Sequence, residues 1–392
     1  MGTPAASAPD QPRFVDIHVL QTLPYSNVNR DDLGSPKTLT FGGTNRTRIS
    51  SQAWKRPTRK AVEEAIGEQA VRTRRLPQQV AGELTDNRGW PADLAELAAA
   101  QIIRSTDSKL ALEQGDKTTA SLLFLPDTAA PALADIAEDH REALHKALGT
   151  KAAAKALLPK DDIHAVLRSL NGSIALFGRM LAEIPGAGVD GAVQVAHAFT
   201  THSTAVQADF FTAVDDAEQW ATDAGSAHMN TAEYSSGVFY RYATLDVREL
   251  TDNLTDPDAH HADTVTARTL AAAFATAFIT SLPQAKKTST APHTIPDLVH
   301  IAVRSDRPVS LAAAFEQPVP ALAAGWAEGS REALDDYAQR IRRLLGGSGL
   351  IHSAYASIDD KPRDGLGNQV ASYPELVDAA LAAVWPPEGA GQ

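Results

Sequence analysis

Two segments of the chain show the clearest alternation of apolar and polar side chains. Residues 14–20 (FVDIHVL) and residues 237–247 (GVFYRYATLDV) place β-branched and aromatic side chains around polar ones. This period of two is typical of a strand. Residues 298–303 form a shorter apolar run that we also predict to be a strand, and the polar residues 24–38 are predicted to be a loop.

Alanine, leucine and charged residues recur at helical spacing in other parts of the chain. We expect helices within residues 93–103, 133–170, 264–282 and 334–345. The first two ranges would belong to an inserted helical subdomain. Strand character returns in residues 171–180 and 189–202. This mixed order predicts an α+β fold with insertions rather than a regular series of βαβ units.

Charge is distributed unevenly along the chain. The 392 residues carry a net charge of −12, yet residues 13–60 contain nine basic and three acidic residues. The rest of the chain therefore has a net charge of −18. Within this part, residues 45–62 (NRTRISSQAWKRPTRKAV) contain no acid at all. A dense positive patch on an acidic protein indicates a surface that binds a polyanion, and the alternative is a basic surface helix without a partner.

The part of the basic segment after Ser50 is predicted to be a helix that runs through Lys60 and Val62 to Ile66, and Arg46 and Arg48 would lie on a preceding strand or loop. Ser50 and Ser51 are candidate N-caps, because their hydroxyls can accept a hydrogen bond from a free amide of the first turn. Pro57 lacks a backbone donor, so we expect a kink at this residue or a helix that starts later.

Basic side chains of this helix would stand in pairs. Lys55 pairs with Arg59, and Arg56 pairs with Lys60, each four residues apart, where like charges repel. A bound single-stranded backbone would remove that repulsion. Such phosphate contacts give salt-sensitive affinity without reading sequence.

Composition excludes several kinds of chemistry. The chain has no cysteine, which excludes disulfides, thiolate nucleophiles and cysteine-bound zinc and suits a reducing compartment. The first dozen residues lack the features of a signal peptide, and the longest apolar stretch, residues 270–279, is too short to cross a bilayer. We expect a cytoplasmic protein that does not use a membrane as a partner.

Short motifs for catalysis or cofactor binding are weak. Residues 186–191 match the dinucleotide pattern G-x-G-x-x-G, but no strand precedes them and β-branched residues follow. His197 and His202 are five apart, which does not place two imidazoles on one helical face, so we expect packed or solvated histidines. Asp31 and Asp32 could hold magnesium, although adjacent loop acids are usually only solvated. No cofactor, metal or catalytic residue is expected.

Longer segments carry a family resemblance. They are NRDD at residues 29–32, FGGTNRTRISSQAWKR at 41–56, GRM at 178–180, VDGAVQVAHAFTTH at 189–202, DFFTAVDD at 209–216 and GSAHMNTAEYSSGVFYRYA at 225–243. In these segments the chain resembles the CasC family, the backbone subunit of the type I-E CRISPR Cascade complex. Pro57 departs from the family pattern.

The resemblance implies a fold and its domains. The fold would be a modified RRM, or ferredoxin-like, palm with a helical fingers insertion and a protruding thumb. The implied palm covers residues 14–60, 188–202 and 237–386, the fingers 61–187, the thumb 203–236, and tails 1–13 and 387–392.

The resemblance also implies a function. Several copies, usually six, would polymerise along the spacer of a crRNA and present it to target DNA. Other Cascade subunits would complete the complex, and a recruited helicase-nuclease would cut, because this subunit has no nuclease activity of its own.

Individual residues take their implied roles from the matched segments. The RNA-facing residues are Arg30, Lys37, Arg46, Arg48, Ser50, Gln52, Lys55, Arg56, Arg59 and Lys60. The thumb residues that interrupt the guide–target duplex are Phe210 and Phe211, and Met180 and Met229 match apolar positions near the bound strands. An adjacent aromatic pair also suits stacking on bases or wedging between them, and the alternative for the pair is ordinary core packing.

Charge further suggests how copies meet. Residues 203–236 contain six acids and no Lys or Arg, whereas residues 13–60 have a net charge of +6. We expect Asp215 and Asp216 of one copy to lie beside Arg46 or Arg48 of the next, a heterologous contact that extends into a filament.

Two other functions remain open from the residues. A related CRISPR backbone protein could cleave target RNA with a metal held by Asp31 or Asp32. A plain oligomeric scaffold could carry an incidental basic surface.

Overall fold

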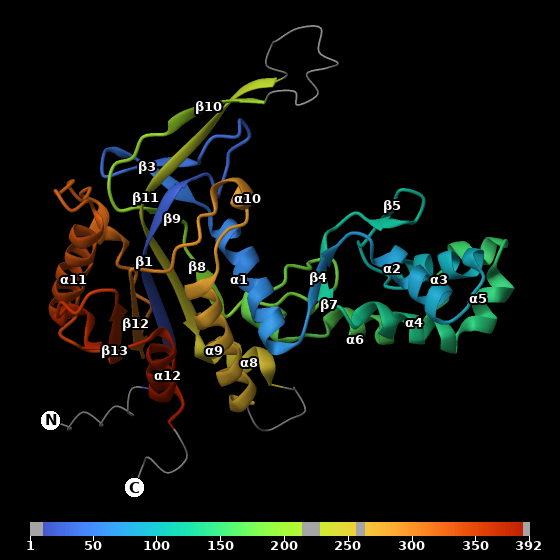
Figure 1. The fold of residues 1–392 in the computed structure, drawn as a ribbon. Helices are drawn as coiled ribbons and strands as arrows, with labels where there is room; N and C mark the ends of the chain where they lie inside the picture. Colours follow the sequence, from blue (N-terminus) through green and yellow to red (C-terminus); the bar gives the residue numbers. More distant parts are fainter. Residues whose placement is uncertain (1–10, 214–227, 256–262, 387–392) are drawn as a thin grey trace, which may run out of the picture. The chain divides into compact units, whose positions relative to one another are not determined.

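The computed structural model describes residues 11–213, 228–255 and 263–386. They fall into two compact units (Figure 1). The sheet unit comprises Met1–Ala61, Val193–Val247 and Ala267–Gln392, and the helical unit comprises Val62–Ala192 and Arg248–Thr266. The predicted tails lie outside the described residues, apart from residues 11–13.

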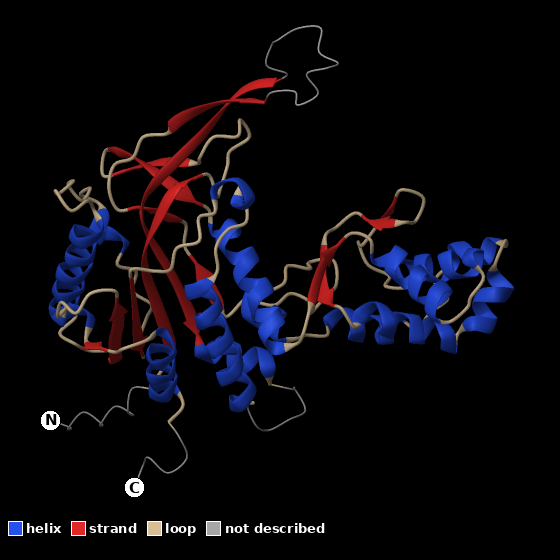
Figure 2. Ribbon diagram, viewed as in Figure 1, coloured by secondary structure: helices blue, strands red, loops and turns tan. Residues whose placement is uncertain are grey.

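A mostly antiparallel sheet forms the centre of the sheet unit (Figure 2). In spatial order its strands are β14 (Asn368–Gln369), β13 (Leu350–Ser357), β12 (Leu298–Arg304), β1 (Phe14–Ser26), β11 (His228–Asp246), β9 (Ala198–Thr200), β3 (Thr44–Ile49) and β2 (Thr38–Phe41), while β8 (Val193–Val195) and β10 (Gln207–Ala213) also pair with β11. Only the short contact between β13 and β14 is parallel. The strands predicted within residues 14–20, 237–247 and 298–303 are confirmed as parts of β1, β11 and β12.

Helices cover both faces of this sheet. Besides the basic helix, the helices of this part of the chain are α9 (Thr264–Thr280), α10 (Lys287–Thr290), α11 (Ala327–Leu344) and α12 (Tyr373–Val384), with short turns η4 (Ala312–Phe315) and η5 (Asp364–Leu366). Helices α9 and α12 share an apolar layer with Val15 and Ile301, whereas α11 and η4 pack around Leu20 and Tyr240. The protein therefore combines helices and strands around a central, mostly antiparallel sheet, which agrees with the predicted α+β class.

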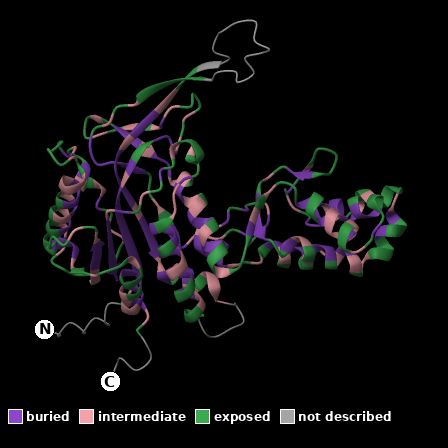
Figure 3. Ribbon diagram, in the orientation of Figure 1, coloured by how far each residue is buried: buried purple, intermediate pink, exposed green. Residues whose placement is uncertain are grey.

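Burial on both faces explains why β1 and β12 are almost wholly protected from solvent (Figure 3). Ile17, for example, pairs with Ala243 on one side and Ile301 on the other, and all three are fully buried. Each fully buried aliphatic side chain contributes about 1.5–3 kcal/mol. This layer is the rigid support of the sheet unit.

A buried polar network crosses the same sheet. The Asp16 carboxylate accepts hydrogen bonds from the Tyr242 hydroxyl (2.8 Å) and from Arg304 Nε (3.2 Å). The His18 ring stacks on His300, with ring centroids 5.2 Å apart. Burial lowers the pKa of His18 well below its ordinary value and lowers that of His300 to about 4. Both imidazoles are therefore neutral at pH 7.

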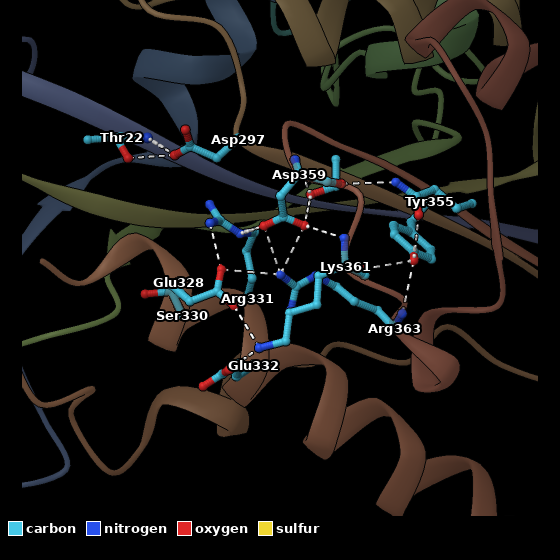
Figure 4. A network of polar contacts seen from close by, with 12 residues as sticks. Thr22, Asp297, Glu328, Ser330, Arg331, Glu332, Tyr355, Asp359, Lys361 and Arg363 are labelled. Atoms are coloured by element: carbon cyan, nitrogen blue, oxygen red, sulfur yellow. Dashed lines mark hydrogen bonds and ion pairs between the residues drawn. The ribbon is translucent and has the colours of Figure 1, made fainter. Parts of the chain in front are cut away.

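Ion pairs tie the start of α11 to the loop that follows β13 (Figure 4). Arg363, whose side chain is buried, lies 3.0 Å from Asp359 and 3.4 Å from Glu328. Arg331 contacts the same two acids, each at 2.7 Å. Hydrogen bonds from Lys361 and the charges of the two arginines lower the pKa of Glu328. The network holds the helix against the outer strands.

The helical unit has its own core. Its elements are β4 (Ala70–Thr73), α2 (Leu76–Gly82), η1 (Glu83–Asn87), α3 (Ala92–Arg104), β5 (Leu112–Glu113), β6 (Thr118–Thr119), β7 (Leu123–Pro126), α4 (Ala129–Asp139), α5 (Arg141–Ala147), η2 (Lys151–Ala154), α6 (Lys160–Arg168), α7 (Gly172–Phe177) and most of α8 (Val247–Leu254). Leu94, Ile102, Leu133 and Leu167 pack together at its centre. Trp90 closes this core, and its indole Nε1 donates to Glu138 at 2.7 Å.

The structure differs from the sequence expectations in several places. Residues 133–170 form separate helices, because turns at His140 and Leu148 interrupt them. The strand expected in residues 171–180 is instead helix α7, which the Asn171 side chain caps and which Gly178 ends with φ +75°. Residues 248–266, assigned to the palm by sequence, cluster with the helical unit. No helix among the described residues is long and apolar enough to cross a membrane.

Candidate nucleic-acid interface

The basic segment begins in strand β3 and, from Ser51 on, forms helix α1 (Ser51–Ile66). Ser50 caps it, because its hydroxyl accepts from the amide of Ala53 (3.3 Å), and its own amide donates to Asn29 Oδ1 (2.8 Å). The helix runs through Pro57, so a later start is wrong. Pro57 has no backbone N–H, so the helix continues through it without one of its hydrogen bonds.

Trp54 anchors this helix on the sheet unit. Its side chain is 1% exposed, and the guanidinium of Arg241 lies 3.8 Å from its ring centroid. Arg241 also lies 4.8 Å from the Phe278 ring and donates to Gln21 Oε1 and to the Phe278 carbonyl. Burial lowers the pKa of Arg241 to about 9, so it keeps its charge at pH 7. A desolvated cation over an aromatic ring contributes about 2 kcal/mol.

This anchor decides which basic side chains reach the surface. Gln52, Arg56 and Lys60 are exposed and follow one another at four-residue spacing, so they form one stripe of the helix. Lys55 is half-buried, and Arg59 is only 8% exposed. The two pairs expected from sequence are therefore not equivalent, and the pair Arg56 and Lys60 is the one that solvent reaches.

Arg46 is not on the surface, contrary to the sequence expectation. It is fully buried, and its guanidinium donates to the carbonyls of Thr200 (2.8 Å) and Phe315 (2.9 Å) and to the Thr44 hydroxyl (2.9 Å). Burial lowers the pKa of Arg46. Its donors are used by the protein itself, so the expectation that Arg46 meets phosphates or acids of a neighbouring copy is wrong.

Arg30, Lys37 and Arg48 are brought together by backbone hydrogen bonds. The amide of Lys37 donates to the carbonyl of Asn29 (3.0 Å), and the amide of Arg48 donates to the carbonyl of Lys37 (2.7 Å). Arg30 forms a bridge with Pro36 and is exposed, while Lys37 and Arg48 are half-buried. These residues extend the basic surface beyond the start of α1.

Asp31 has a role inside the same loop. Its Oδ1 accepts from the amides of Leu33 (3.0 Å) and Ser35 (2.9 Å), which closes the turn. Asp32 is exposed. Among the described residues, no group of three or more His, Cys, Asp or Glu is placed to hold a metal.

Phe210 and Phe211 lie on the hairpin of β10 and β11. They pair with Thr231 and Asn230, and successive residues of a strand point to opposite faces. Phe210 is 63% exposed and Phe211 is 41% exposed, so the alternative of core packing is wrong. Residues 214–227, with Asp215 and Asp216, lie outside the described part, as does the side chain of Met229.

Met180 stands on a loop of the helical unit and is 92% exposed. Backbone hydrogen bonds between Arg179 and Val189 hold the loop, which lines an open groove of about 780 Å³. A Cβ on Gly178 would lie 2.7 Å from the amide nitrogen of Gly191, so this close backbone crossing needs glycine. The glycines of residues 186–191 thus belong to a structural loop, and no helix opens after them.

His197 is exposed, as expected for a solvated histidine, but its contact with the basic helix was not foreseen from the sequence. Its Nδ1 accepts from the amide of Ser51 (2.9 Å), the first residue of α1. No local signal could reveal this contact, because it joins residues 146 positions apart. His202, in contrast, is packed as expected: its ring stacks on Trp326 at 4.0 Å and accepts from the amide of Val238 (3.1 Å).

Comparison with known proteins places this arrangement in a class, that of subunits of RNA-guided surveillance complexes. One solved chain, described as "CRISPR RNA-guided surveillance complex, pre-nicking", is 47% identical with a TM-score of 0.89, over 95% of this chain and 100% of its own. Another, described as "CRISPR RNA-guided surveillance complex", is 42% identical with a TM-score of 0.78, over 94% and 99%.

The family follows from a second comparison. Residues 15–379 match the family model described as CT1975-like protein, and the chain belongs to this family. The recognised likeness to CasC-type backbone subunits is confirmed at this level, whereas membership of type I-E stays a prediction. The search of curated proteins found no match.

Proposed function

We propose that this protein is the crRNA-binding backbone subunit of a type I-E CRISPR surveillance complex in the cytoplasm. Copies assemble along the spacer of the guide RNA, with an RRM-like palm, helical fingers and a thumb in each. The assembled RNA pairs with target DNA. Other subunits complete the complex, and a separate helicase-nuclease cuts the DNA, since the backbone subunit itself is not a nuclease.

One observation carries the proposal. An acidic protein exposes Gln52, Arg56 and Lys60 as one stripe of a helix that a buried tryptophan anchors, next to Lys37 and Arg48. Basic and amide side chains bind backbone phosphates whatever the base sequence of the RNA. Because the helix is held rigidly, less entropy is lost when these side chains are ordered on binding. The family and both solved relatives support the same role.

The test is recovery of RNA with the assembled protein. The chain is produced together with a CRISPR array and the partner subunits, and the RNA that co-purifies is sequenced. Recovery of spacer RNA of every sequence in the array supports the proposal. A complex that assembles without RNA contradicts it, and cleavage of complementary RNA in Mg²⁺ contradicts the non-nuclease part.

Charge-matched variants locate the surface. Arg56→Ala/Lys60→Ala should weaken RNA binding for all spacers and reduce the slope of log K against log salt by about 0.7 for each lost phosphate contact. The control is Arg342→Ala/Arg343→Ala, which removes the same charge from two exposed residues of α11. Equal losses in both variants would mean that only net charge matters.

A further inference from the structure

His197 occupies an unusual place beside the basic surface. It lies between β8 and β9, is exposed, and accepts through Nδ1 from the Ser51 amide at 2.9 Å. An imidazole nitrogen that accepts a hydrogen bond carries no proton, so the neutral ring has its N–H at Nε2. The ring thus supports the start of α1 only while it is uncharged.

The charges that act on this ring are positive. Burial lowers the pKa of His197, and the charges of Arg48 and Lys37 lower it further. Lys37 precedes β2 and Arg48 belongs to β3. The first turns of α1 add the cations Lys55 and Arg56, whereas strands β8 and β9 contain no charged residue. A protonated His197 ring would be repelled by Lys37 and Arg48, and an anion bound between the three side chains would offset this repulsion.

We propose that His197 is a further residue of the RNA-contacting surface, and that it takes up a proton when an RNA phosphate lies against Lys37 and Arg48. The inference rests on the proposed function. The protonated ring releases the Ser51 amide and presents two N–H donors, so one more charge-assisted contact reaches the phosphate.

The sign of the pH dependence follows from linkage. In the free protein the pKa of His197 lies below its ordinary value, and a bound phosphate raises it. Between these two pKa values RNA binding takes up a proton. Affinity therefore rises as pH falls, by at most about tenfold for each pH unit.

Asparagine provides a matched variant. In His197→Asn, Oδ1 stands where Nδ1 stood and can still accept from Ser51, but the side chain does not titrate. The dissociation constant of the full-length protein for a single-stranded RNA oligonucleotide is measured from pH 8.0 to pH 6.0 at constant ionic strength. Thermal unfolding of both proteins at pH 8.0 checks that the support of α1 is preserved.

Each result decides a separate point. We expect wild-type affinity to increase about threefold or more on going from pH 7.5 to pH 6.0, relative to His197→Asn. Identical pH profiles in the two proteins would overturn the inference and leave the proposed function intact. Absence of RNA binding by the wild type at every pH would overturn the proposed function itself.

If His197→Asn does not fold, a second measurement on the wild-type protein tests the same inference. The pKa of His197 is followed by NMR of histidine-labelled wild-type protein, with and without the same oligonucleotide. We expect RNA to raise it. An unchanged value overturns the inference.

Discussion

The first turns of the basic helix and the β10–β11 hairpin both belong to the sheet unit, yet they are held in opposite ways. The first turns of α1 are held by Ser50 and by Trp54, which is buried against Arg241. The hairpin instead pairs β10 with β11 alone and leaves Phe210 and Phe211 exposed. Burial shows where a mutation will cost stability, and exposure shows where it will cost binding.

The largest expected effect concerns the anchor of the basic helix. Trp54→Ala should destabilise the protein by about 3–5 kcal/mol, because it leaves a cavity and removes the ring that covers the Arg241 guanidinium. Urea unfolding measures the change. Trp54→Phe keeps an aromatic face and should lose less, and a loss below 1 kcal/mol in the alanine variant would contradict the role of the anchor.

The next largest effect is expected at Arg46, which is buried, compared with Arg48, which is half-buried on the same strand. Arg46→Met should cost about 2–3 kcal/mol, because the carbonyls of Thr200 and Phe315 lose their charged donor inside the protein. Arg48→Met, the matched variant, should change stability less but weaken RNA binding. The comparison fails if the two variants are equally stable.

Lowering the pH should reduce the free energy of unfolding by a similar amount, through a histidine buried in the sheet. The pKa of His300 in the folded protein is about 4, below the ordinary 6.5. The stability that depends on a neutral His300 is therefore fully present above pH 6.5 and is lost as the pH falls toward 4. The loss at pH 5 is about 2 kcal/mol, at about 1.4 kcal/mol for each unit. Urea unfolding of wild type and His300→Gln at pH 7 and pH 5 checks this.

Other buried groups bear on that experiment. His18 acts in the same direction, whereas the raised pKa of Asp16 acts against both at acid pH. The informative quantity is therefore the difference in pH slope between the wild type and His300→Gln. Parallel slopes would mean that His300 does not titrate below its ordinary value.

The smallest effect on stability, with the clearest effect on function, is expected in the hairpin. Phe210→Ala/Phe211→Ala should change the free energy of unfolding by less than about 0.5 kcal/mol, because both side chains are exposed. Guide RNA should still bind, whereas capture of target DNA should fall. Gel-shift assays with RNA and with duplex target measure the two steps, and unchanged capture would contradict the thumb role.

Local patterns were sufficient for much of the fold and for part of the candidate site. Alternation located β1 and β11, an apolar run located β12, and one of the two candidate N-caps, Ser50, proved to be the cap. The acid-free run identified the basic surface. These features depend on neighbours in the sequence, so a single chain read alone contains their signal.

Contacts between distant segments were decided only by the tertiary structure. Arg46 and Arg48 are two residues apart on one strand, yet carbonyls from residues 200 and 315 take the donors of Arg46. Ser51 meets His197 in the same way. The sequence does not show whether a basic residue will contact phosphate or buried carbonyls, because its burial depends on distant segments that pack around it. The sequence by itself determined the main strands β1, β11 and β12, the start of the basic helix and the positive charge. The packing of strands far apart in the chain determined which of those charges reach the surface.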